Sequence, residues 1–165
     1  MATQIYQPEL DTILLNSISA YENGDPFCAA ILETAYVTGL RMNEILEVNR
    51  WTVETELLFK VNLEKGDSIR KIDSAIIPRV LKDYYTVGAS NPVYTYSAIL
   101  WRLNKALPII TVNGDVRRSS AHLFRYNFIK KLHNEGFTPT EIKTIICHKS
   151  QGSTNQYIFD NLYLH

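Results

Sequence analysis

Cysteine is scarce in this chain, and its placement excludes several classes of protein. Only two cysteines occur among the 165 residues, Cys28 and Cys147. Their separation matches neither a zinc-binding nor a thiol-redox motif. A disulfide framework of the kind found in small secreted domains is excluded too, so we interpret both residues as reduced thiols of a cytosolic protein.

Long apolar segments are lacking as well. No stretch approaches the ~18 consecutive apolar residues that a membrane-spanning helix requires. Residues 1–10 contain Gln, Tyr, Pro and Glu in place of the basic start and apolar run of a signal peptide. These absences predict a soluble intracellular protein that does not enter a membrane.

Net charge is also absent, with 17 Lys and Arg against 17 Asp and Glu, but the charges are unevenly placed. Residues 1–78 hold 6 basic and 12 acidic residues, a balance of −6, whereas residues 79–165 hold 11 and 5, a balance of +6. The basic half permits a local phosphate-binding surface, because counterion release depends on the charges at the contact. A mixed, solvated surface without a ligand would explain the same numbers.

The chain has the size of one domain, and 45% of its residues are hydrophobic, enough to bury a core. Apolar residues at helical spacing predict helices over residues 8–19, 25–35, 41–48, 79–85, 94–107, 120–134, 139–147 and 153–162. Asp25-Pro26 and Thr138-Pro139 are expected helix starts, and Gly39 is expected to end the second helix.

The hydrophobic period changes toward two after Trp51. Residues 57–62 and 68–77 are rich in Ile, Leu, Val and Phe, and residues 64–67 between them, Glu-Lys-Gly-Asp, have the composition of a turn. This pattern predicts a β-hairpin with Lys65 at or near its tip. The expected fold is therefore mainly α with one small antiparallel β-sheet, an α+β architecture.

Arg41 is a candidate anion-binding residue. It follows Gly39 and opens a helix, so its guanidinium and the free backbone N–H groups there could bind one anion. A surface arginine paired with Glu44 or Glu47 along the helix is the alternative. The two interpretations are compatible, because Glu44 could orient the arginine.

Further candidates lie in the basic half of the chain. His122 and Arg125 are three residues apart on one helical face with apolar neighbours, so a buried Arg125 would need an anionic partner. Taken alone, His122 also fits a buried, hydrogen-bonded histidine. His148 fits a helix-end histidine that interacts with the dipole. Tyr157 is one of ten tyrosines, so by itself it indicates nothing.

Together these residues resemble the catalytic domain of the tyrosine recombinases, the phage-integrase family of site-specific DNA recombinases. Arg125 and His148 are 23 residues apart, and Tyr157 follows nine residues later, separations similar to those of the family. The resemblance covers about residues 25–160. The matching residues, in chain order, are Thr38-Gly39-Leu40-Arg41-x-x-Glu44, the hairpin lysine, His122-x-x-Arg125, His148 and Tyr157.

The resemblance implies a cleavage chemistry that needs no metal or other cofactor. Arg41 and Arg125 would stabilise the charge that develops on the attacked phosphate. Tyr157 would attack the phosphorus, form a 3′-phosphotyrosyl bond and release a 5′-hydroxyl strand. His122 would serve as base or hydrogen-bond partner of the phenol, and His148 would bond the phosphate.

The same resemblance assigns a proton donor to the hairpin. A lysine there would protonate the leaving 5′-oxygen. Lys65 in the predicted turn is the first candidate, and Lys60 and Lys71 are the alternatives. Two positions depart from the family pattern without removing a catalytic group: Cys147 replaces the usual glycine before the second histidine, and Tyr126 replaces a smaller residue or histidine.

The expected function is that of a site-specific recombinase or integrase of a mobile element. Its expected partners are double-stranded DNA and further copies of itself, four on the DNA during recombination, in the cytoplasm of a prokaryotic cell or a virus-infected host. We expect one catalytic domain over residues 1–165 without the family's N-terminal core-binding domain. Two alternatives stay open: a type IB topoisomerase-like nicking and closing enzyme, and a DNA-binding regulator that does not cleave.

Overall fold

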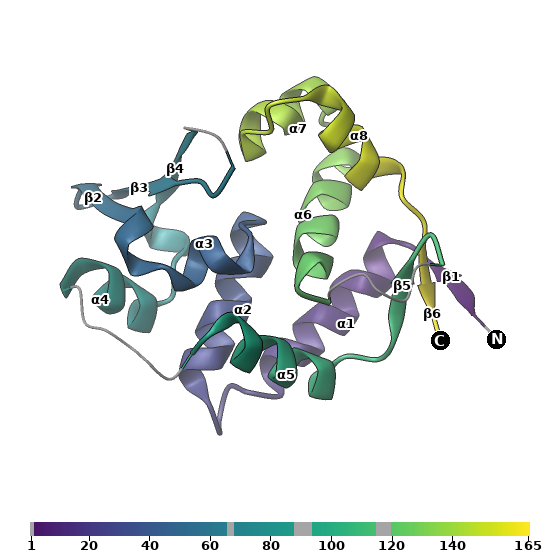
Figure 1. Ribbon diagram of the computed structural model, residues 1–165, viewed down its shortest axis with the longest axis horizontal. Coiled ribbons are helices and arrows are strands. Elements are labelled where there is room, and N and C mark those ends of the chain that lie inside the picture. The colour runs from purple at the N-terminus through teal and green to yellow at the C-terminus, as the bar shows by residue number, and fades with distance from the viewer. Residues whose placement is uncertain (1, 66–67, 88–93, 115–119) are drawn as a thin grey trace.

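The computed structural model describes residues 2–65, 68–87, 94–114 and 120–165. Within these ranges helices predominate, and the short strands form two separate three-stranded antiparallel sheets (Figure 1). The mainly α, α+β architecture predicted from the sequence is thus confirmed. No helix in the described ranges is both long and apolar enough to cross a membrane.

All eight predicted helical segments are present, with shifted ends. The segment predicted at 41–48 is helical only over five residues, because the backbone of Glu47 is extended (ψ 96°). The segment predicted at 120–134 begins with a 3-10 turn, Ser120–His122, and the last helix ends before the predicted residue 162. The helices are α1 Gln7–Ser19, α2 Pro26–Thr38, α3 Met42–Leu46, α4 Arg79–Val87, α5 Tyr96–Ala106, α6 Leu123–Asn134, α7 Pro139–Ile146 and α8 Gln151–Phe159.

Local capping explains why several of these helices start where they do. The Asp25 side chain accepts a hydrogen bond from the backbone N–H of Cys28 at the start of α2. Thr138 and Glu141 form a capping box at the start of α7, each side chain accepting from the other's backbone N–H. Such caps each contribute about 1 kcal/mol, which favours one start position over its neighbours.

The predicted hairpin is part of a larger sheet. Strands β3 (Leu58–Asn62) and β4 (Ile69–Asp73) pair as expected, but β2 (Trp51–Thr55) adds a third strand in the order β2-β3-β4. The predicted second strand is shorter than 68–77, because a 3-10 turn over Ser74–Ile76 follows it. Lys65 is described at the hairpin turn, and residues 66–67 lie outside the described ranges.

The prediction of a single sheet is wrong, since a second one joins the two ends of the chain. Its strands are β1 (Thr3–Ile5), β6 (Leu162–Leu164) and β5 (Ile110–Val112), in the order β1-β6-β5. Each strand is only three residues long, too short for hydrophobic alternation to identify. Leu162, predicted to be helical, lies in β6.

Packing around α6 places the C-terminal helices. Helix α6 contacts α1 and α2 on one side and α7 and α8 on the other (Figure 1). Ile129 of α6 forms a small buried cluster with Ile142 and Ile146 of α7 and Ile158 of α8. This cluster fixes α8 against α6, so the C-terminal candidates lie beside those on α6.

Candidate active site

Four of the six predicted catalytic residues line a single pocket of about 240 Å³. They come from the start of α3, the β3–β4 turn and the start of α6, which face one another across the centre of the molecule (Figure 1). The fold therefore brings together residues that are up to 84 positions apart. The pocket is lined by Arg41, Met42, Asn43, Glu64, Lys65, Tyr96, Ala121, His122 and Arg125.

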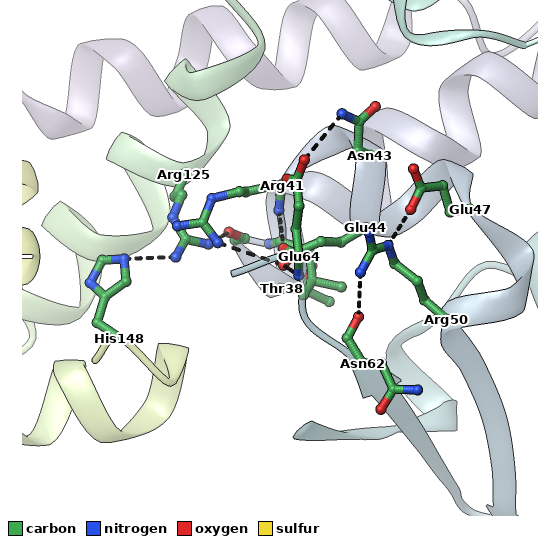
Figure 2. A network of polar contacts seen from close by, with 12 residues as sticks. Thr38, Arg41, Asn43, Glu44, Glu47, Arg50, Asn62, Glu64, Arg125 and His148 are labelled. Atoms are coloured by element: carbon green, nitrogen blue, oxygen red, sulfur yellow. Dashed lines mark hydrogen bonds and ion pairs between the residues drawn. The ribbon is translucent and has the colours of Figure 1, made fainter. Parts of the chain in front are cut away.

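Glu44 organises one side of this pocket. Its carboxylate is fully buried and accepts hydrogen bonds from the backbone N–H of Arg41 (2.7 Å) and of Glu64 (2.9 Å). The Arg41 guanidinium lies 3.6 Å from the same carboxylate. The ion pair weighed in the sequence thus exists, but with a buried carboxylate. The Glu44 carboxylate thereby joins the start of α3 to Glu64, the residue next to Lys65 (Figure 2).

The structure distinguishes among the three candidate lysines. Lys65 lines the pocket. The ammonium groups of Lys60 and Lys71, which are paired across β3 and β4, both lie 3.5 Å from the carboxylate of Glu54, and neither lines the pocket. Lys65 is therefore the hairpin lysine placed to reach a ligand in the pocket.

Arg125 is a buried cation whose described hydrogen-bond partners are neutral. Its Nη1 donates to the backbone oxygen of Gly39 (2.7 Å), and its Nη2 lies 2.8 Å from Nε2 of His148. Its Nε has no hydrogen-bond partner among the described residues. Burial and the nearby charge of Arg41 lower the pKa of this guanidinium. Among the described residues the expected anionic partner is thus not in direct contact with Arg125, and an anion in the pocket could supply the negative charge.

His148 is held in one neutral tautomer. A guanidinium has no acceptor, so Nε2 of His148 must accept from Arg125, and Nδ1 must carry the proton. Nδ1 then donates to Oγ1 of Thr154, 2.9 Å away. Burial, followed by the positive charges of Arg125, Arg41 and Lys65, lowers the pKa of His148 to about 4. The imidazole is therefore uncharged at neutral pH and orients Arg125 (Figure 2).

Thr154 had no recognisable signal in the sequence. It is completely buried on α8 and lies three residues before Tyr157. Cys147, one of the two departures from the family pattern, ends α7 in the left-handed conformation (φ 58°). Glycine adopts this conformation without strain, whereas any other residue there lowers the folding stability by about 1–2 kcal/mol. This cost explains why glycine suits the position. The turn directs His148 back toward α6.

Tyr157 lies on α8 beside the two histidines and Arg125. Its hydroxyl is 3.5 Å from Nδ1 of His122, a long contact that an in-line substrate could shorten. Its ring is stacked on His148 with 5.7 Å between centroids, and the Arg125 Cζ lies 5.6 Å from the ring centroid. The sixth candidate thus joins the other five in one cluster.

Gly39 allows the two halves of this site to approach. It ends α2 with φ 67°, and a Cβ added there would lie 2.5 Å from Cδ1 of Phe128 on α6. Glycine is therefore required twice, for the left-handed backbone and for the close contact with α6. Its carbonyl also accepts the hydrogen bond from Arg125.

We expect Gly39→Ala to lower the free energy of unfolding by about 2–4 kcal/mol, because backbone strain and overpacking add. Urea denaturation followed by circular dichroism measures this change. Gly24→Ala is the matched control, since a Cβ at Gly24 meets no heavy atom within 4 Å. Equal stabilities of the two variants would contradict the close approach of Phe128.

Comparison with known proteins gives a structural match only. No family model and no curated protein matches the sequence. The solved structure of the XerH site-specific recombinase bound to palindromic difH substrate, a post-cleavage complex, matches with a TM-score of 0.57 and 19% identity over 94% of this chain. The pre-cleavage complex with difH gives the same values, and XerA recombinase gives 0.59, 18% and 92%.

The chain spans 49% of the length of XerH and 58% of that of XerA, about half of each. The similarity covers 92–94% of this chain. The chain therefore has the tyrosine recombinase catalytic-domain fold.

Proposed function

We propose that the protein is a site-specific DNA recombinase that cuts and rejoins DNA through a 3′-phosphotyrosyl intermediate. The observation that carries the proposal is one pocket lined by Arg41, Lys65, His122 and Arg125, with the hydroxyl of Tyr157 3.5 Å from His122. These are the groups that bind, attack and protonate a phosphodiester. The recombinase complex with DNA on the same fold supports the choice of substrate.

In the proposed reaction the phenolic oxygen of Tyr157 attacks the phosphorus, and the bond from phosphorus to the 5′-oxygen breaks. His122 accepts the phenolic proton, and Lys65 donates a proton to the leaving oxygen. The two guanidiniums hold the non-bridging oxygens as charge accumulates on them. The resemblance led us to expect that His148 bonds the phosphate, but both of its ring nitrogens are bonded to Arg125 and Thr154. Its proposed role is therefore to keep the Arg125 guanidinium in place.

The phosphotyrosyl bond conserves the energy of the original linkage, so a 5′-hydroxyl can reverse the reaction without ATP. Exchange follows when that hydroxyl belongs to a second duplex. Two strands of each of two duplexes must be cut, so the proposed recombination uses four copies of the protein on double-stranded DNA. Integration of a mobile element is one use of such an exchange.

A suicide substrate tests this function. The wild-type protein is incubated with a randomised duplex library that carries a nick next to each possible cleavage position, so that the short 5′-hydroxyl strand diffuses away. We expect a protein–DNA adduct that survives denaturing electrophoresis. DNA binding without any adduct would overturn cleavage and favour the regulatory alternative. Relaxation of supercoils without strand exchange between duplexes would favour the topoisomerase-like one.

A further inference from the structure

Asp160 joins the end of α8 to two other parts of the chain. It follows the helix directly and lies three residues after Tyr157. Its carboxylate accepts a hydrogen bond from the hydroxyl of Tyr126 (2.5 Å) and another from the side-chain amide of Asn113 (2.8 Å). Tyr126 is on α6, and Asn113 follows β5, so one carboxylate connects three elements.

The same end of α8 has a second attachment to α6. Lys130 donates to the backbone oxygens of Ile158 (2.9 Å) and Asp160 (2.7 Å). These carbonyls belong to the last turn of the helix and its cap, which otherwise lack an intrahelical partner. Burial lowers the pKa of Lys130, and the Asp160 carboxylate partly opposes that effect.

Tyr126 contacts the candidate nucleophile itself. Its side chain is almost fully buried, and its ring centroid lies 4.6 Å from that of Tyr157, with 51° between the ring planes. It also adjoins Arg125 in the sequence, at the position where this chain departs from the family pattern. One side chain therefore both packs against the Tyr157 ring and bonds the residue that follows the helix.

Helix α8 needs such attachments because it is short and poorly buried. It has nine residues, of which only Thr154 and Ile158 are buried. The cluster around Ile158 packs α8 against α6 and α7, but two buried side chains on one face constrain a small tilt about that face less than a wider buried surface would. A tilt would move the Tyr157 oxygen away from the line of attack, and a misplacement of ~1 Å can cost a reaction about a hundredfold in rate.

We propose that Tyr126 and Asp160 are positioning residues that hold Tyr157 in line with the phosphate bound at Arg125. The inference rests on the proposed function, because it assigns the tyrosine as nucleophile. The bond from Tyr126 to Asp160 fixes the C-terminal end of α8, while Thr154 and His148 fix its middle. Neither positioning residue exchanges a proton with the substrate.

Tyr126→Phe tests this inference, since it removes one hydroxyl and keeps the ring against Tyr157. We expect the rate of adduct formation to fall roughly tenfold, with DNA affinity within about twofold of wild type. Tyr36→Phe is the matched control, because the Tyr36 hydroxyl donates to Asp11 at 2.8 Å between α2 and α1, and Tyr36 does not line the pocket. The control should cleave at the wild-type rate.

Hydrogen exchange gives a readout that does not depend on cleavage. Amides of α8 should exchange faster in Tyr126→Phe than in wild type or Tyr36→Phe, while those of α6 stay unchanged. Asp160→Ala should slow cleavage at least as much as Tyr126→Phe, because it also removes the bond from Asn113. The double variant should be no slower than Asp160→Ala, because the bond that Tyr126→Phe removes is already absent there.

The outcomes separate this inference from the proposed function. If wild type forms the adduct and Tyr126→Phe forms it equally fast, the positioning role is wrong. A purely structural role would lower the melting temperature of Tyr126→Phe and Tyr36→Phe alike and leave the cleavage rate below melting unchanged. If wild type forms no adduct, the proposed function fails, and the positioning of Tyr157 for attack is overturned with it, whatever α8 exchange shows.

Discussion

Replacing Tyr157 by phenylalanine should abolish the covalent protein–DNA adduct. Phenylalanine keeps the ring that stacks on His148 but has no oxygen to attack phosphorus. Since no second group in a one-nucleophile mechanism substitutes for it, we expect the adduct to fall by at least about 10³-fold, below detection. DNA affinity should stay near the wild-type value, because the charges that bind phosphate are intact. The suicide-substrate assay and a gel-shift titration measure the two quantities.

The control for this variant is Tyr163→Phe, which makes the same change in the neighbouring strand β6. It should form the adduct at the wild-type rate. An adduct that persists in Tyr157→Phe would show that another tyrosine attacks. Tyr96 would then be the first to replace, because its side chain lines the pocket. Peptide mapping of the wild-type adduct identifies the attached residue independently.

The helices could be predicted because the signals that define them are local. Hydrophobic periodicity, capping side chains and helix-ending glycines each depend on residues close together in the sequence, as at Asp25, Gly39 and Thr138. The sheet β1-β6-β5 could not be predicted, because its three-residue strands are defined by pairing between the two ends of the chain. The 3-10 start of α6 and the early end of α8 depend on tertiary contacts in the same way.

The candidate site, like the fold, could be predicted from the sequence only in part. The order and spacing of the residues identified all six candidates, because a resemblance to a family depends on sequence motifs and does not require knowledge of where the fold places them. The resemblance left three hairpin lysines as candidates. The structure separates them, because Lys60 and Lys71 are ion-paired with Glu54 and only Lys65 of the three lines the pocket. The resemblance could not reveal Thr154, whose role exists only as a hydrogen bond to His148.

Arg125→Gln should lower the rate of adduct formation by about 10²–10³-fold, because the variant loses a positive charge that lies beside the Tyr157 ring and lines the pocket. Its stability should change far less, by about 1 kcal/mol, since two effects oppose each other. The change leaves the Gly39 carbonyl and Nε2 of His148 with poorer partners. It also removes a cation whose pKa is lowered by burial and by the nearby charge of Arg41.

Inorganic phosphate separates an anion-binding guanidinium from a structural one without DNA. At constant ionic strength, phosphate at ten times its dissociation constant should stabilise the wild-type protein by ~1.4 kcal/mol, because only the folded state binds it. Arg125→Gln should lose this stabilisation. Arg79→Gln should keep it, because it removes the same charge from an exposed position on α4. If phosphate stabilises all three proteins equally, Arg125 does not bind the anion. A large loss of stability in Arg125→Gln alone would show that Arg125 mainly stabilises the fold. The slower cleavage by this variant would then follow from unfolding.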